Sequence, residues 1–259
     1  WVEHELTSVP WPINSRPVDL DGDGDADVVA GSTTEQRIMW FENLGRGDFT
    51  EHRIEISGSA VPEERRRAID AGNPAAVNGF NMDFVDLSQD GRLDIILVES
   101  GNTFVWLEQP IDSNGPWMIH AIGTNWPDAA TGFVMTDING DGYSDLIGGG
   151  YSRGPRDRDG DMDPLASMGR IAWFEHPGDA MGEWIRHDIS RRRRGMFDKF
   201  VPRDMDQDGD VDFVATRGNS APYDGVFWLE QVRSSESLPS FERARVNDSR
   251  EAPLPVEVR

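Results

Sequence analysis

Cysteine is absent from this chain of 259 residues, and Lys199 is its only lysine. Without cysteine the chain can form neither disulfide bonds nor thiolate metal sites, and it has no cysteine nucleophile. No apolar run approaches the roughly 18 residues that a membrane span requires. The first residues have neither the basic nor the apolar region of a signal peptide, so we expect any such peptide to have been removed. Packing and bound metal remain as sources of stability.

Positive charge is also scarce. The 25 Lys and Arg residues face 47 Asp and Glu residues, which gives a formal net charge of −22 at pH 7. A compact fold with this charge repels itself unless cations neutralise part of it. The same charge disfavours nucleic acid as a partner, because phosphates are bound by Lys and Arg. The hydrophobic content of 37% still suffices for one domain or a closed array of repeats.

Many of the acidic residues follow one pattern, D-x-D/N/S-x-D-G-x-x-D, which occurs four times. The copies span residues 19–27, 86–94, 137–145 and 204–212. Their recurrence along the chain indicates an internal repeat.

Each acidic copy lies between two short apolar segments with strand character. A third segment follows, with the pattern W-F/L-E-N/Q/H, and a fourth strand-like segment closes each unit. The third segments contain Trp40, Trp106, Trp173 and Trp228, and the fourth span residues 49–54, 117–122, 184–189 and 241–246. Four strands form a small sheet that must stack on its neighbours to bury both faces. We therefore expect an all-β fold in which these tryptophans pack between sheets.

The acidic loops, their flanking strands and the tryptophan segments together resemble FG-GAP/VCBS repeats, the blades of integrin-α-type and many bacterial secreted propellers. The resemblance covers roughly residues 1–246. It implies a β-propeller of four-stranded antiparallel blades in one domain, 1–259. The expected repeats are approximately 10–57, 75–123, 128–190 and 196–247, followed by a tail at 248–259.

Residues 1–9 do not fit a simple ring of four blades. They resemble an extra outer strand, because His4 matches His52, His120 and His187 of the fourth segments, yet the last unit already has its own fourth segment. Either the two termini form a partial fifth blade, or the chain is a section of a longer propeller. The residues leave both alternatives open.

The family resemblance and the analogy with the EF-hand loop imply calcium in these loops. Calcium takes six to eight oxygen ligands, and loop positions 1, 3, 5 and 9 would supply side-chain oxygens. The implied ligands of up to four ions are Asp19, Asp21, Asp23 and Asp27; Asp86, Ser88, Asp90 and Asp94; Asp137, Asn139, Asp141 and Asp145; and Asp204, Asp206, Asp208 and Asp212. Glycine at position 6 permits the sharp turn. We expect the second site to be the weakest, because the Ser88 hydroxyl replaces a carboxylate.

A partner would bind at the opposite end of the blades. In this family the metal loop joins strands 1 and 2, so the loops from strand 2 to 3 and from strand 4 to 1 share the other face. The expected ligand-binding residues there are Arg66, Arg67, Trp126, Tyr151, Arg153, Arg193, Lys199 and Tyr223. Guanidinium groups pair with carboxylate or sulfate, which suits an anionic glycan or an acidic protein surface. The alternative is that the arginine runs are solvated loops that balance the acidic excess.

No catalytic motif is present. Whether the chain is an enzyme therefore stays open, and we favour a protein without catalytic activity. Tyr151 and Tyr223 are the candidate bases if the chain is a polysaccharide lyase or sugar dehydratase acting on an acidic sugar. We expect a secreted or periplasmic calcium-binding propeller that acts in recognition or adhesion. A third alternative is a structural subunit of an extracellular assembly, which self-associates through exposed blade edges.

Overall fold

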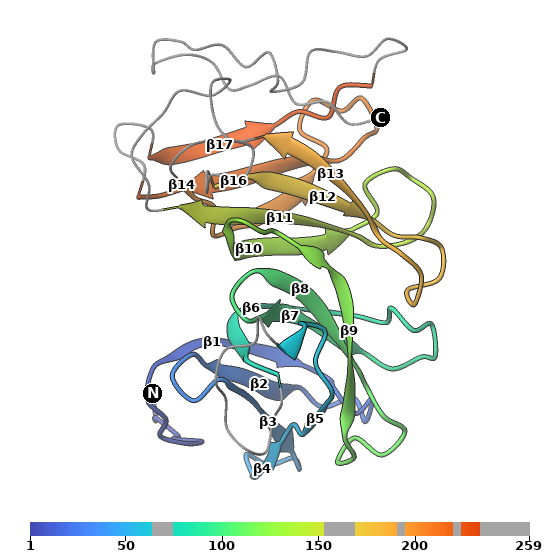
Figure 1. Ribbon diagram of the computed structural model, residues 1–259. Coiled ribbons are helices and arrows are strands. Elements are labelled where there is room, and N and C mark those ends of the chain that lie inside the picture. The colour runs from blue at the N-terminus through green and yellow to red at the C-terminus, as the bar shows by residue number, and fades with distance from the viewer. Residues whose placement is uncertain (64–74, 153–168, 191–194, 220–223, 234–259) are drawn as a thin grey trace. The chain divides into compact units, whose positions relative to one another are not determined.

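The computed structural model describes residues 1–63, 75–152, 169–190, 195–219 and 224–233. This part of the chain contains β-strands and no α-helix, as Figure 1 shows. The chain divides into two compact units, residues 1–122 and residues 123–259. The expected all-β fold is confirmed.

Two sheets belong mainly to the first unit. One has the order β1 (Pro12–Val18), β2 (Asp27–Ser32), β3 (Arg37–Asn43) and β4 (Phe49–Arg53). The other has the order β6 (Val77–Val85), β7 (Asp94–Glu99), β8 (Thr103–Glu108) and β9 (Trp117–Thr124), with β5 (Ile56–Ser57) parallel to β9 at its edge.

The second unit holds the other two sheets. One has the order β10 (Ala129–Thr136), β11 (Asp145–Ser152), β12 (Ile171–Glu175) and β13 (Ile185–Ser190), and β14 (Gly195–Met196) also pairs with β11. The last described sheet has the order β15 (Phe200–Arg203), β16 (Asp212–Arg217) and β17 (Gly225–Leu229). Sequential antiparallel strands of this kind form the blades of propellers.

The acidic loops join the first and second strands in all four sheets, as predicted. They connect β1 to β2, β6 to β7, β10 to β11 and β15 to β16. Aspartate at position 9 begins the second strand each time, at Asp27, Asp94, Asp145 and Asp212. The metal-loop motif and the blade repeat therefore coincide in the fold.

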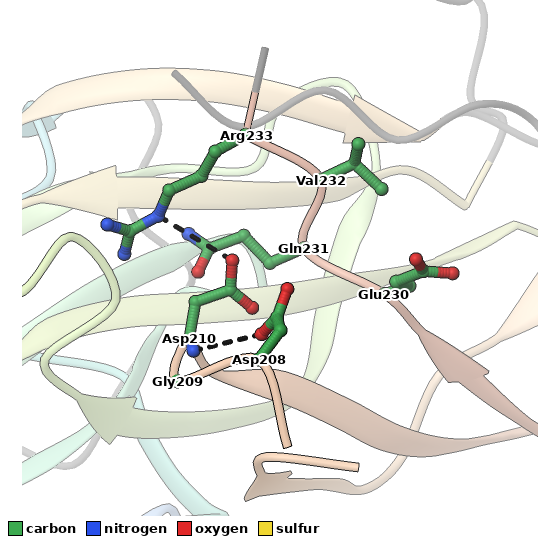
Figure 2. Close-up of a pocket in the computed structure, with 7 residues that line it drawn as sticks. All are labelled: Asp208, Gly209, Asp210, Glu230, Gln231, Val232 and Arg233. Carbon is green, nitrogen blue, oxygen red and sulfur yellow. Dashed lines mark hydrogen bonds and ion pairs between the residues drawn. The ribbon is translucent and has the colours of Figure 1, made fainter. Parts of the chain in front are cut away.

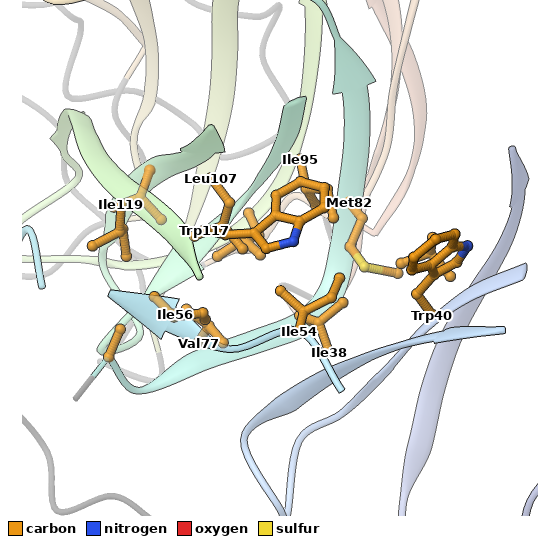
Figure 3. Packing of buried hydrophobic residues seen from close by; sticks show 14 of the residues in the cluster. Ile38, Trp40, Ile54, Ile56, Val77, Met82, Ile95, Leu107, Trp117 and Ile119 are labelled. Atoms are coloured by element: carbon orange, nitrogen blue, oxygen red, sulfur yellow. The ribbon is translucent and has the colours of Figure 1, made fainter. Parts of the chain in front are cut away.

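Apolar side chains of successive sheets form the cores. In the first unit Ile38 and Trp40 of β3 belong to one buried cluster with Met82 of β6 and Ile95 of β7 (Figure 3). In the second unit Trp173 of β12 belongs to a cluster with residues of β15 and β16. Trp40, Trp106 and Trp173 are 2%, 1% and 1% exposed, so the prediction that they lie in the core is confirmed. Trp228 differs, because 39% of its surface is exposed.

Two glycines lie where the two sheets of the first unit are in direct backbone contact. A Cβ atom added to Gly31 of β2 would lie 2.4 Å from the Cα atom of Gly79 in β6. Only glycine at both positions permits this backbone contact.

The ends of the chain depart from the expected strand pattern. Residues 1–9, expected as an extra outer strand, contain no strand, and the first strand begins at Pro12. A strand needs a partner for its ladder hydrogen bonds, and within the described residues none of the strands pairs with this segment. The expected fourth strand at 241–246 and the tail at 248–259 lie outside the described residues.

Candidate functional site

The backbone of each acidic loop turns at two positions. Glycine at position 6 has a φ angle of 90–97° in all four loops, at Gly24, Gly91, Gly142 and Gly209. These values are accessible to glycine and strained for other residues. Position 4 also has positive φ, including 58° at Gln89 and 67° at Gln207. These two left-handed positions, one residue apart, point several backbone N–H groups towards the start of the loop.

The first aspartate of each loop receives these N–H groups. Asp19 Oδ1 accepts from Gly22 N at 2.9 Å, and Asp19 Oδ2 accepts from Gly24 N at 3.1 Å. Asp86, Asp137 and Asp204 accept from the glycine at position 6 in the same way. These hydrogen bonds close the loop, as in other Asx turns.

Three carboxylates converge in the first and fourth loops. Ligand oxygens of Asp19, Asp21 and Asp23 all lie within 4.8 Å of one another, and those of Asp204, Asp206 and Asp208 do the same. Burial and the neighbouring carboxylates raise the pKa of Asp21 above its usual value. Such a cluster is electrostatically favourable for a divalent cation.

The second and third loops are less acidic. In the second, Ser88 Oγ lies 3.5 Å from Asp86 Oδ1, and Asp90 forms an ion pair with Arg92. In the third, the Asn139 side-chain amide donates to Asp141 Oδ2 at 3.0 Å. The ion pair of Asp90 agrees with the prediction that the second loop is the weakest metal site, which stays a prediction.

The aspartate at position 9 is buried in every loop and binds protein N–H groups. Asp27 Oδ2 accepts from Leu20 N at 3.1 Å and from Trp40 Nε1 at 3.0 Å, and Asp27 Oδ1 accepts from Asn43 N at 2.8 Å. The other three aspartates accept equivalent bonds, from Leu87 and Gln109, from Ile138 and His176, and from Met205 and Gln231. This carboxylate therefore ties the acidic loop to the end of the third strand.

Sequence reasoning missed this structural role. One feature of the sequence could have indicated this role. The residue after glutamate in each W-F/L-E-N/Q/H segment donates its backbone N–H to the position 9 aspartate in all four sheets. Burial raises the pKa of Asp94, and it raises the pKa of Asp145 to about 6. The assignment of the position 9 aspartates as metal ligands stays a prediction.

In the third loop the side chain at position 7 packs against the residue that follows the third strand. Tyr143 stacks on His176 with ring centroids 4.9 Å apart. In the fourth loop a pocket is lined by Asp208, Asp210, Glu230 and Arg233 (Figure 2). There Arg233 Nε lies 3.6 Å from Asp210 Oδ2, and burial beside Asp208 raises the pKa of Asp210 to about 6.

The loops fit calcium by their donor chemistry. Their side chains offer oxygen donors, which hard cations prefer, and the first and fourth loops gather three carboxylates each. Water and backbone carbonyls commonly complete such sites. The described donors would hold calcium at positions 1, 3 and 5 even where the position 9 carboxylate serves the fold.

A second polar cluster lies at the opposite ends of β10 and β11. Arg170 donates from Nη1 to Asp128 Oδ2 at 2.8 Å and from its backbone N at 3.0 Å, and both side chains are buried. Asn125 is fully buried, and among the described residues neither atom of its side-chain amide has a hydrogen-bond partner. Arg186 Nη1 donates to the carbonyl oxygens of Thr124 and Trp126 at 2.7 and 3.2 Å.

The cluster contains residues from two loops. Asn125 and Asp128 lie between β9 and β10, and Arg170 lies just before β12. Asp128 precedes β10, whereas the acidic loop follows it after eight residues of strand. At about 3.3 Å per residue the two ends are roughly 25 Å apart. Trp126, a predicted ligand residue, is 54% exposed beside the cluster.

The other predicted ligand and catalytic residues divide into two groups. Tyr151 of β11 is half-buried and pairs with Ala129 and Met196, and Lys199 is exposed just before β15. Arg66, Arg67, Arg153, Arg193 and Tyr223 lie outside the described residues. Tyr151 near the end of β11 and Lys199 just before β15 lie at the strand ends opposite the acidic loops, as Asp128 does. The roles assigned to Tyr151 and Lys199 stay predictions.

The comparison with protein families gives a match. A family model described as FG-GAP-like repeat matches residues 19–97 and 86–148, which contain the first three acidic loops. No curated protein matches the chain. Across the part of the chain that the structure describes, helices of a length and hydropathy suited to crossing a membrane are absent.

Proposed function

Because the chain belongs to the FG-GAP-like repeat family, we propose that it is a calcium-binding recognition module that binds an anionic glycan. The metal would occupy the acidic loops, and the glycan would bind at the opposite blade ends. The observation that carries the second part is the exposed Trp126, which lies beside the buried polar cluster of Asn125, Asp128 and Arg170.

Calcium would act structurally in this proposal. The loops link the first two strands of each sheet, and their carboxylates repel one another when no cation is bound. A bound ion removes this repulsion and rigidifies the turn. The net charge of −22 favours the binding of any divalent cation. Outside cells calcium is abundant enough for weak sites of this type, so we propose an extracellular or periplasmic location.

The opposite strand ends provide the groups that a sugar ligand needs. Trp126 offers an exposed aromatic face, and the exposed Lys199 supplies positive charge in a chain that has little of it. The side-chain amide of Asn125 is fully buried, and its donor and acceptor have no protein partner among the described residues. Buried polar groups of this kind are usually satisfied by water.

The experiment is isothermal titration of the full chain with uronate-containing and sulfated oligosaccharides, with neutral oligosaccharides for comparison. We expect binding of the anionic sugars only. Trp126→Ala should weaken it roughly tenfold, because loss of one aromatic contact of about 1.4 kcal/mol corresponds to that factor. Monitoring the mixtures for unsaturated sugar products tests the lyase alternative at the same time.

Leu44→Ala provides the matched control. Leu44 is also an exposed large apolar residue, but it lies at the acidic-loop end of its sheet, next to Asn43. The control should bind as the parent chain does. Absence of binding to every anionic sugar would contradict the glycan proposal and leave an acidic protein surface as the partner. Equal weakening by both substitutions would contradict the assignment of the face.

A further inference from the structure

Gln109 connects two acidic loops of the first unit. It follows β8, and its backbone N–H donates to Asp94 Oδ1 of the second loop at 3.0 Å. Its side-chain Nε2 donates to the carbonyl oxygen of Leu20 in the first loop at 2.8 Å. Gln109 is 1% exposed, so both bonds lie away from solvent, where hydrogen bonds are stronger. One buried residue therefore ties the first loop to the second.

The neighbours of the Gln109 side chain fix the orientation of its amide group. Besides its bond to Leu20, Nε2 donates to Ser113 Oγ at 3.3 Å, so it faces two oxygen atoms. An amide turned over would place Oε1 against the Leu20 carbonyl oxygen, and two acceptors repel each other. The Gln109 amide is therefore a donor to the first loop.

The second unit contains the same connection. The backbone N–H of Gln231 donates to Asp212 Oδ1 of the fourth loop at 2.9 Å. Its Nε2 donates to the carbonyl oxygen of Ile138 in the third loop at 3.1 Å. Ile138 holds position 2 of its loop, as Leu20 does in the first. In both units a glutamine thus joins the loop of its own sheet to the loop of the preceding sheet.

The corresponding residues of the other two sheets make local bonds. Asn43 holds this position at the end of β3, and its Nδ2 donates to the carbonyl oxygen of Ala26 in its own loop at 3.0 Å. His176 holds it after β12, and its Nδ1 accepts from Gly178 N at 3.0 Å. A connecting glutamine therefore occurs at this position once in each unit.

Each connected pair combines a strongly acidic loop with a less acidic one. The first and fourth loops contain the clusters of three carboxylates. Their partners, the second and third loops, have Ser88 and Asn139 at position 3. A loop that should bind calcium more tightly is thus joined to a loop that should bind it more weakly.

We propose that Gln109 makes calcium binding cooperative between the first and second loops, and that Gln231 does the same between the fourth and third. This inference rests on the calcium sites proposed above. Occupation of the loop with three carboxylates raises the calcium affinity of its weaker partner. By reciprocity the weaker loop raises the affinity of the stronger one by the same factor.

The coupling acts through position 2 of the loop. Leu20 lies between Asp19 and Asp21, so an ion held by these two carboxylates restricts the carbonyl group between them. The Leu20 carbonyl holds the Gln109 amide, and the Gln109 backbone holds Asp94. Asp94 Oδ2 in turn accepts from the backbone N–H groups at positions 2 and 3 of the second loop, at 2.9 and 3.0 Å. Ordering of one loop therefore removes part of the conformational entropy that the other loses on binding.

The substitution Gln109→Met tests the connection. Methionine has a similar unbranched side chain without the amide donor, while the backbone N–H bond to Asp94 remains. NMR titration of the full chain with calcium measures the two sites separately. The amide signals of Gly24 and Gly91 report the first and second loops, because each amide donates to the first aspartate of its own loop.

The measured quantity is the effect of Asp21→Asn on calcium binding at the second loop. Asp21→Asn weakens the first loop, and its effect on charge is the same in both chains, so that effect cancels in the comparison. We expect the weakening at the second loop to be larger in the parent chain than in the Gln109→Met chain. The expected difference is roughly two- to tenfold, the range that one hydrogen bond supports.

Asn43→Leu is the matched control. Asn43 holds the position of Gln109 in the first sheet, and its side-chain amide donates within its own loop, so its replacement should leave the coupling intact. The pair Gln231→Met and Asp206→Asn repeats the experiment in the second unit, read from the amide signal of Gly142 in the third loop. This repeat decides the question if Gln109→Met does not fold.

Three results would overturn the proposal, and they differ in what they contradict. Signals of Gly24 and Gly91 that do not respond to calcium would contradict the calcium sites, and the coupling with them. Calcium responses with the same effect of Asp21→Asn in the parent and Gln109→Met chains would contradict the coupling alone. Equal loss of coupling in Asn43→Leu would assign it to general loosening of the loops instead of to the connecting side chain.

Discussion

Buried aspartates in this protein differ by what surrounds them. The aspartates at position 9 accept hydrogen bonds from the acidic loop and from the end of the third strand, and each such bond to a charged acceptor contributes about 1.5–3 kcal/mol. Asp198, between β14 and β15, has no comparable set, because its buried Oδ1 lacks a partner among the described residues. Burial alone raises the pKa of its carboxyl group. At Asp94 and Asp145 burial also raises the pKa, but hydrogen bonds to the carboxylate offset part of the cost of its charge, whereas at Asp198 nothing among the described residues offsets that cost.

The substitution Asp198→Asn tests this difference through pH. Because the folded-state pKa lies above the ordinary value of 3.8, the folded protein holds the proton more tightly than the unfolded chain does. The stability contributed by the protonated group is complete below 3.8 and is lost as the pH rises through the folded-state pKa. Asp198→Asn should therefore raise the free energy of unfolding at pH 7.5 by about 1 kcal/mol, with little difference near pH 4.

Thermal unfolding at both pH values measures the effect. Glu55→Gln is the control, because Glu55 is exposed and its side chain makes no hydrogen bond within the described part of the chain. This control should change the midpoint equally little at both pH values. A stabilisation by Asp198→Asn that does not grow with pH would contradict the role assigned to its charge.

At the scale of elements, the loops and the sheet contacts place different demands on glycine. Glycine at position 6 of the acidic loops serves backbone conformation, as its positive φ shows. Gly31 instead serves the contact between β2 and β6, where a Cβ atom would lie 2.4 Å from the Cα atom of Gly79. Loop glycines can be recognised from the motif, whereas the contact glycines become visible only when two sheets pack.

Gly31→Ala should separate the two sheets or strain them. We expect a loss of about 1–3 kcal/mol in the free energy of unfolding, the usual cost of overpacking, measured by chemical denaturation. Gly225→Ala is the matched control, because a Cβ atom at Gly225 meets nothing within 4 Å. It should change stability by about 0.5 kcal/mol or less. Equal effects of the two substitutions would show that strand propensity, rather than the close approach, sets the cost.

At the scale of the whole molecule, net charge and metal binding are linked. The chain carries a formal net charge of −22 at pH 7, and each calcium ion bound in an acidic loop would cancel two negative charges. Binding to the folded state alone stabilises it, by about 2.7 kcal/mol per site at a free concentration of 100 times the dissociation constant. The proposed sites therefore predict a large dependence of stability on calcium.

Thermal unfolding with excess EDTA and with millimolar calcium measures this dependence. The midpoint should rise with calcium and rise less with magnesium, which dehydrates reluctantly and demands octahedral geometry. The double substitution Asp21→Asn with Asp206→Asn should remove much of the rise, because it affects the two loops with three clustered carboxylates. Asp48→Asn, outside the motif, should leave the rise intact. An identical midpoint in EDTA and calcium would exclude the proposed metal role.

The sequence by itself determined the repeated elements of this protein. Alternating apolar segments, glycine at position 6 and the W-F/L-E-N/Q/H segments predicted the strands, the loops between first and second strands and three of the buried tryptophans. These features follow from local rules, because turn conformation and strand periodicity depend on residues close together in the chain. The family match then agreed with the resemblance that the same residues carry.

The tertiary structure alone decided which groups meet across the chain. Asp27 and its counterparts accept N–H groups from the end of the third strand, and Asn125 lies buried beside Asp128 and Arg170. The physical reason is that burial and hydrogen bonding depend on which segments meet in space, and residues close together in the chain do not state this.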